Sequence, residues 1–140
     1  MARARSTVLA LLAATIVGAG CGGSMQPDEL ARSIGTLESA AAEGALLAND
    51  VARDRTKATF ARVHARDLSE TVDHEAEKLH DASAHGLVAE RKAAAVALAG
   101  RISQALGLIQ TAPDSEQEGR TAASDLTRYG DRAGKLAEGL

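Results

Sequence analysis

Apolar residues recur along residues 27–140 in four stretches, at the alternating spacing of three and four positions that places them on one face of an α-helix. The first stretch shows the pattern most clearly, with an apolar stripe formed by Leu30, Ile34, Leu37, Ala41, Gly44, Ala48 and Val51. Polar residues fill the positions between, so each stretch has one face for a core and one for solvent. The pattern predicts helices at about residues 27–53, 59–83, 87–110 and 114–138.

Helix-breaking and capping residues separate the four stretches. Pro27 and Pro113 stand where the first and fourth helices are expected to begin, a place where the missing backbone N–H has no partner to lose. The pair His85-Gly86 marks the end of the second helix. Because the connections are short, neighbouring helices should run antiparallel. We therefore predict an all-α fold, an antiparallel up-down-up-down four-helix bundle with helices roughly 36 Å long.

Many of the predicted core positions are alanine, and the chain has one Phe, one Tyr and no Trp. Such helices should pack closely and leave little interior volume, so no cofactor is expected. Residues 93–99, AAAVALA, are apolar on nearly all sides. Either this third helix is the most buried one, or its outer side around Val96 and Ala97 contacts another protein. Three glycines in the fourth helix, Gly130, Gly134 and Gly139, should make it the least stable element.

Residues 1–20 have a different pattern from the rest of the chain. Arg3 and Arg5 give a short positive start, and an uncharged, almost wholly apolar run follows at residues 7–17. This run is shorter than the roughly 20 residues that a transmembrane helix needs, and small residues follow it. The arrangement is typical of a secretory signal peptide, here residues 1–20.

Residues 17–21, VGAGC, resemble the lipobox of bacterial lipoproteins, with Gly18 where that class usually has a branched apolar residue. The resemblance implies that the leader is removed just before Cys21, the only cysteine, and that its thiol carries a diacylglycerol. The mature chain would then be lipid-anchored to a bacterial cell membrane on its extracytoplasmic side. Residues 21–26 would hold the lipidated cysteine and a short flexible tether. The alternatives are an ordinary leader residue and a free thiol.

The charge balance of the mature chain argues against nucleic acid as a partner. Removing Arg3 and Arg5 from the 16 basic residues leaves 14 against 19 acidic ones, a net charge of −5. A negative surface repels both nucleic acid and anionic lipid. The chain should be held at the membrane by its lipid and not by its charge.

All four histidines lie in or just after the second helix, which is also rich in acids. The candidate ligands for a weakly bound divalent metal are His74, Glu77, His80 and Asp81. Glu77 and His80 have the Glu-x-x-His spacing of di-iron bundles, but both point away from the apolar stripe. The sequence therefore favours a solvated polar face over a metal site for these residues.

His64 differs from the other histidines because it lies at the edge of the apolar stripe, one turn after Phe60. The sequence favours a boundary histidine that packs on Phe60 and has a hydrogen-bond partner nearby, with a metal ligand as the alternative.

The chain has no haem-attachment motif, no nucleophile elbow and no phosphate-binding glycine loop, so enzymatic activity is not expected. The sequence favours a non-enzymatic, lipid-anchored envelope protein that binds another envelope protein or itself, or has a structural role. The candidate contact surfaces are the outer side around Val96 and Ala97, and Leu46 on the first helix. The alternative is an envelope metal-binding protein that uses the second helix.

Overall fold

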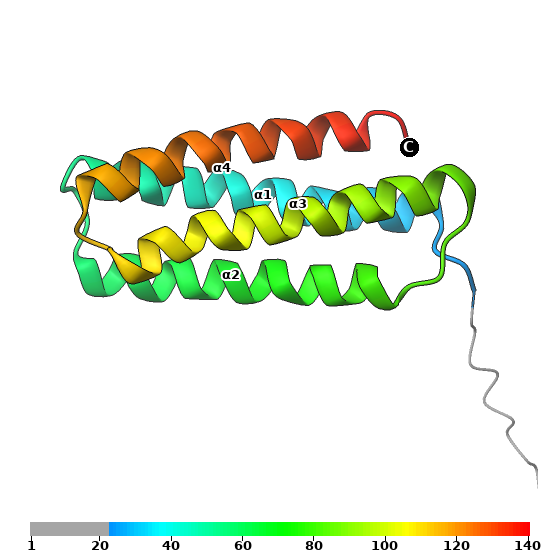
Figure 1. Cartoon of the computed structure of the whole chain (residues 1–140), viewed down its shortest axis with the longest axis horizontal. Helices are drawn as coiled ribbons and strands as arrows, with labels where there is room; N and C mark the ends of the chain where they lie inside the picture. The colour runs from blue at the N-terminus through cyan, green and yellow to red at the C-terminus, as the bar shows by residue number, and fades with distance from the viewer. Residues whose placement is uncertain (1–22) are drawn as a thin grey trace, which may run out of the picture.

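The computed structural model describes residues 23–140, which form a bundle of four long helices (Figure 1). The helices are α1 (Pro27–Ala52), α2 (Ala58–Asp81), α3 (Gly86–Thr111) and α4 (Glu116–Ala137). The predicted all-α bundle is confirmed, and every helix begins and ends within two residues of its predicted bounds. The leader and the lipidation at Cys21 lie outside the described residues.

Successive helices run in opposite directions around the bundle (Figure 1). α1 packs most extensively on α4, and α2 packs most extensively on α3. The helices α1 and α3 also contact each other across the bundle, whereas α2 and α4 do not meet in the part of the chain that the structure describes. The bundle is therefore compressed along the α1–α3 diagonal.

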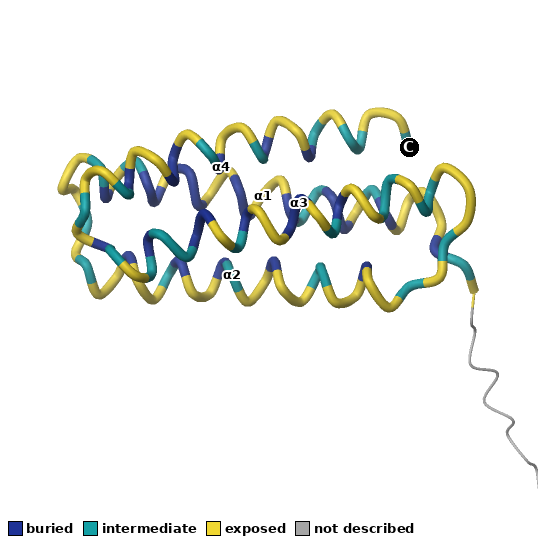
Figure 2. The backbone as a smooth tube through the Cα atoms, viewed as in Figure 1, coloured by how far each residue is buried: buried dark blue, intermediate teal, exposed yellow. Residues whose placement is uncertain are grey.

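The core is built mainly on α1. Every residue of the stripe predicted for this helix is buried, and so are Ser33, Ala40, Ala45 and Leu47. With eleven buried residues against seven on α3, α1 is the most buried helix. Of the two interpretations of the apolar segment at residues 93–99, the structure excludes the first. Ala93, Ala94 and Ala97 of α3 are exposed, and exposed and buried positions alternate along that helix (Figure 2).

Glycines allow α4 to lie close against α1. A Cβ atom on Gly119 would stand 2.6 Å from the backbone nitrogen of Ala52 and 3.0 Å from the carbonyl oxygen of Ala48. On α1, Gly44 faces side chains and not backbone: an added Cβ there would crowd Leu126 of α4 and Leu106 of α3. Small residues thus bring the two backbones together, which is why this pair has the most extensive contact.

The residues just before α1 are part of the bundle, which corrects the expectation of a flexible tether up to residue 26. Met25 is only 7% exposed and belongs to the core cluster. Its backbone N–H donates to the carbonyl oxygen of Ser83 at 2.8 Å, in the connection between α2 and α3. Residues 24–26 are held because the Met25 side chain is buried at this end of the bundle. The C-terminus lies at the same end (Figure 1).

Candidate functional site

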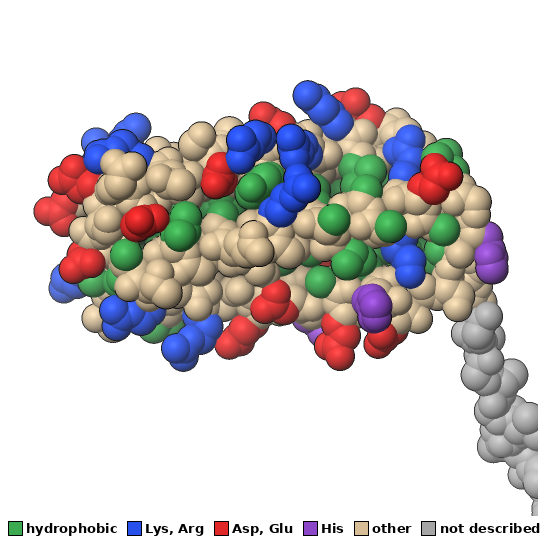
Figure 3. All heavy atoms as spheres, in the orientation of Figure 1, with side chains coloured by type: hydrophobic (Ala, Val, Ile, Leu, Met, Phe, Trp, Pro, Cys, Tyr) green, Lys and Arg blue, Asp and Glu red, His purple; other side chains and the backbone are tan. Residues whose placement is uncertain are grey.

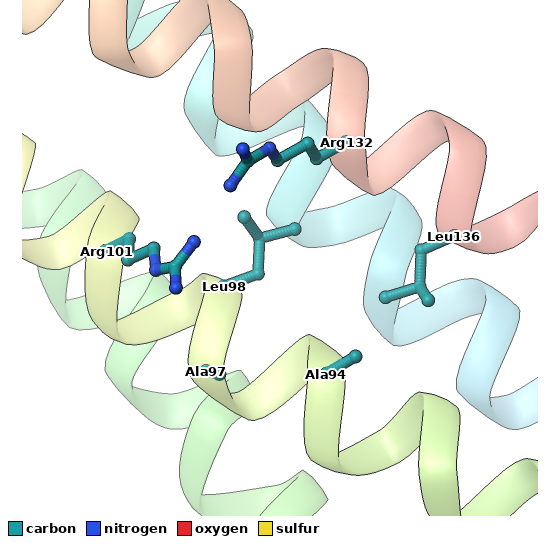
Figure 4. A pocket seen from close by; sticks show the side chains of 6 residues that line it. All are labelled: Ala94, Ala97, Leu98, Arg101, Arg132 and Leu136. Carbon is teal, nitrogen blue, oxygen red and sulfur yellow. The ribbon is translucent and has the colours of Figure 1, made fainter.

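The groove between α3 and α4 is the surface feature with the clearest chemical character. Its volume is about 290 Å³, and it is open to solvent. The lining residues are Ala94, Ala97, Leu98 and Arg101 from α3, with Arg132 and Leu136 from α4 (Figure 4). On α3 the four residues span two turns at the helical spacing of positions 94, 97/98 and 101, and on α4 the two are four positions apart, so each set lies along one side of its helix. We call this surface the α3–α4 groove.

Two arginines from different helices flank the apolar part of the α3–α4 groove. In Figure 4 the guanidinium groups of Arg101 and Arg132 extend over Leu98, one from each side. None of the five ion pairs among the described residues includes either arginine. Figure 3 shows basic side chains beside apolar ones on this face of the molecule. Such a surface suits a group that combines an apolar side chain with negative charge.

The predicted contact surface on α3 overlaps this groove. Ala97 is exposed and lines it, whereas Val96 is half-buried and packs against the core. By length and composition alone, α3 is the one described helix that could cross a membrane, a test that core helices of soluble proteins also pass. Here it packs against α2 and α4, and only its outer side stays exposed.

A second groove, of about 370 Å³, lies on the other side of α4, against α1. Its apolar part includes Ala42, Ala45 and Leu46, and its acidic groups are Glu38 and Asp131. Leu46, the second predicted contact residue, is 70% exposed, more than any other large hydrophobic residue described. Neither carboxylate takes part in an ion pair among residues 23–140. We call Leu46, Glu38 and Asp131 together the Leu46 face.

The histidines and acids of α2 do not converge on a site. His74, Glu77, His80 and Asp81 are all exposed. Histidine and acidic side chains lie along the edge of the molecule where Figure 1 shows α2 (Figure 3). Within the described range, no group of three or more His, Cys, Asp or Glu side chains is placed to hold a metal ion. The acids of this helix make other contacts instead: Asp73 accepts a hydrogen bond from Ser103 Oγ at 2.6 Å.

His64 joins α2 to α1. Its ring stacks on Phe60 with 5.5 Å between the centroids and 20° between the planes. Its Nε2 atom lies 2.8 Å from Oε1 of Glu43 on α1. The side chain is partly exposed, and both partners suit a residue that packs at the boundary between core and solvent.

No family model, curated protein or solved structure matches this chain. The two arginines of the α3–α4 groove were not among the residues that the sequence singled out. A local signal exists for one of them, because Arg101 lies within the apolar α3, directly before the buried Ile102. No comparable signal marks Arg132, because α4 is rich in charged residues along its whole length.

Proposed function

We propose that this protein is a small lipid-anchored component of the bacterial cell envelope that acts by binding a protein and not by catalysis. The observation that carries the proposal is the α3–α4 groove, where exposed apolar residues lie beside two arginines that have no ion-pair partner among the described residues. Protein interfaces are enriched in apolar residues and arginine at their centres. The partner would supply a carboxylate and an apolar side chain.

The lipid anchor at Cys21 places this groove in the envelope. Its support is the lipobox-like sequence at residues 17–21, behind a charged and then apolar leader. Two acyl chains on one cysteine anchor a protein stably, whereas one chain does so only marginally. Because residues 24–26 pack on the bundle, the anchored cysteine would stand only a few residues from the folded domain. A partner would therefore be met close to the membrane surface.

A photo-crosslinking amino acid in place of Ala97 tests the protein-binding role in intact cells. We expect a specific crosslinked product from this position, because Ala97 lines the α3–α4 groove. The matched control is the same amino acid in place of Glu70, which is exposed on α2 away from the groove. Equal labelling from both positions, or none from Ala97, would contradict the proposal.

A Cys21→Ala variant tests the anchor separately. Without the thiol there is no site for the lipid, so the protein should leave the membrane fraction and lack the mass of acyl chains. Native mass spectrometry of the protein extracted in mild detergent measures both. Retention in the membrane with an unchanged mass would show that Cys21 is not the anchor.

A further inference from the structure

We infer that the partner of the α3–α4 groove is a second copy of this chain, which docks its Leu46 face there. The inference rests on the proposed function, because it names the protein that the same groove binds. It is drawn from the charges and the exposed apolar groups on the two sides of α4.

Leu46 supplies the apolar part of the contact. Because the side chain is 70% exposed, most of its apolar surface contributes nothing to stability in the isolated chain. Burying that surface against a second copy would provide a favourable free energy of association. Beside its two arginines, the α3–α4 groove offers apolar surface at the exposed Ala94 and Ala97 and at the half-buried Leu136, whereas Leu98 forms its buried floor. Leu46 shares its own groove with small residues such as Ala42 and Ala45, and its side chain stays largely uncovered there.

The charges decide which surfaces can meet. The α3–α4 groove has two arginines and the Leu46 face has two carboxylates, and none of these four groups is paired within the described chain. If the grooves of two copies faced each other, their arginines would repel. If the Leu46 faces of two copies faced each other, their carboxylates would repel. The favourable combination is head-to-tail, with the Leu46 face of one copy against the groove of the next.

The two surfaces lie at similar heights along the bundle. Their lining residues on α4, at 126–131 and 132–136, are centred about five residues apart, an axial shift of about 8 Å. Two copies with parallel axes can therefore meet with their N-terminal ends on the same side, as anchorage in one membrane requires. Confinement to a membrane would raise the effective concentration and strengthen the association beyond what the isolated protein shows.

Self-association of the full chain, purified from membranes in mild detergent, tests the inference by native mass spectrometry. The wild-type protein should form concentration-dependent oligomers. Leu46→Asp alone, and Arg101→Glu with Arg132→Glu, should each weaken association by roughly tenfold or more, because each removes one side of the contact. The control is Val63→Asp, since Val63 is an exposed apolar residue of α2 outside both surfaces. Circular dichroism checks that each variant remains helical.

Mixing the two deficient variants gives the sharper test. The Leu46→Asp variant keeps an intact groove, and the double arginine variant keeps an intact Leu46 face. A head-to-tail contact predicts that an equimolar mixture forms a 1:1 complex that neither variant forms alone. Absence of that complex, a wild-type protein that stays monomeric, or an equal effect of Val63→Asp would each overturn the inference. If the chain is monomeric but the crosslinker at position 97 captures a different protein, this inference fails and the proposed function stands. If the crosslinker captures no protein at all, the proposed function fails as well.

Discussion

Gly119 is the residue on which the close approach of α4 to α1 depends most. The atoms that a side chain at this position would meet belong to the backbone of α1, at Ala48 and Ala52. A backbone cannot move aside as a flexible side chain can. Glycine inside a helix lowers the stability of that helix, but at this position it allows α4 to pack more closely on α1 than any other residue would.

Gly119→Ala should destabilise the protein by about 1–3 kcal/mol, although alanine is the better helix former. Urea denaturation followed by circular dichroism measures the change. The matched variant is Gly100→Ala on the exposed side of α3, where an added Cβ has no atom within 4 Å. This variant should gain about 0.5–1 kcal/mol. A gain at both positions would show that the α1–α4 contact is looser than described.

Ser33 is the one buried polar residue of the core, and its hydroxyl has no hydrogen-bond partner among the described residues. A buried, unpaired hydroxyl is unfavourable, so Ser33→Ala should raise the free energy of unfolding by roughly 1 kcal/mol. Ser39→Ala is the control, because Ser39 is exposed and its hydroxyl already donates to Gly35. A loss of stability in Ser33→Ala would mean that this hydroxyl has a partner.

The exposed histidines of α2 allow a direct test of the metal-binding alternative. Because His74, Glu77, His80 and Asp81 lie in solvent and do not converge, we expect no stoichiometric metal at this face. The measurement is elemental analysis of the protein after equilibration with a divalent ion such as Zn²⁺. A stoichiometric metal that is lost in a His74→Ala, His80→Ala double variant would make this face a metal site.

At the scale of elements, α3 stabilises the ends of both its neighbours. Arg91 Nη1 donates to the carbonyl oxygen of Leu136 at 2.6 Å, in the last turn of α4. The ammonium group of Lys92 donates to the carbonyl oxygen of Ala82 at 2.7 Å, at the end of α2. Cations at helix C-termini satisfy free carbonyl groups and oppose the helix dipole. The end of α4, expected from its glycines to be weak, thus has a partner on α3.

Arg91→Met should cost about 1–2 kcal/mol, because it removes both the charge and the hydrogen bond at the end of α4. The effect should be local as well, with faster hydrogen exchange of the backbone amides at residues 134–138. Arg120→Met, which removes an exposed ion pair with Glu116 and an exposed hydrogen bond to Gln117, should change stability by less than about 0.5 kcal/mol. Unchanged exchange in the last turn of α4 would exclude this role for Arg91.

At the scale of the whole molecule, the N-terminal end of the bundle determines how close the domain stands to its proposed anchor. Met25→Asp should detach residues 23–26, because a charged side chain is unfavourable in that buried position. We expect faster proteolytic cleavage before α1 and a loss of stability of roughly 2 kcal/mol. The control is Gly23→Ala, since Gly23 is exposed and an added Cβ there has no atom within 4 Å. Cleavage at the wild-type rate in Met25→Asp would show that these residues are not held by Met25.

The residues that sequence reasoning placed correctly are those governed by their own helix. The stripe from Leu30 to Val51 is buried as predicted, because helical periodicity is a local property. Met25 was missed because its position depends on packing against the end of the bundle, where its backbone N–H donates to Ser83, far along the chain. The α3–α4 groove was missed for a similar reason. Arg101 and Arg132 line the same groove only because α3 and α4 pack side by side with a particular distance and axial alignment.

The sequence by itself determined the four helices, their approximate ends, their inward faces and the all-α class, because hydrophobic period, prolines and glycines act over a few residues. Only the tertiary structure decided that α1 and not α3 is the most buried helix and that Gly119 lies against a backbone. It also decided that the groove on one side of α4 has two arginines and the groove on the other side has two carboxylates. Each of these depends on which surfaces of two helices face each other, and a single helix's pattern does not specify its neighbour's position.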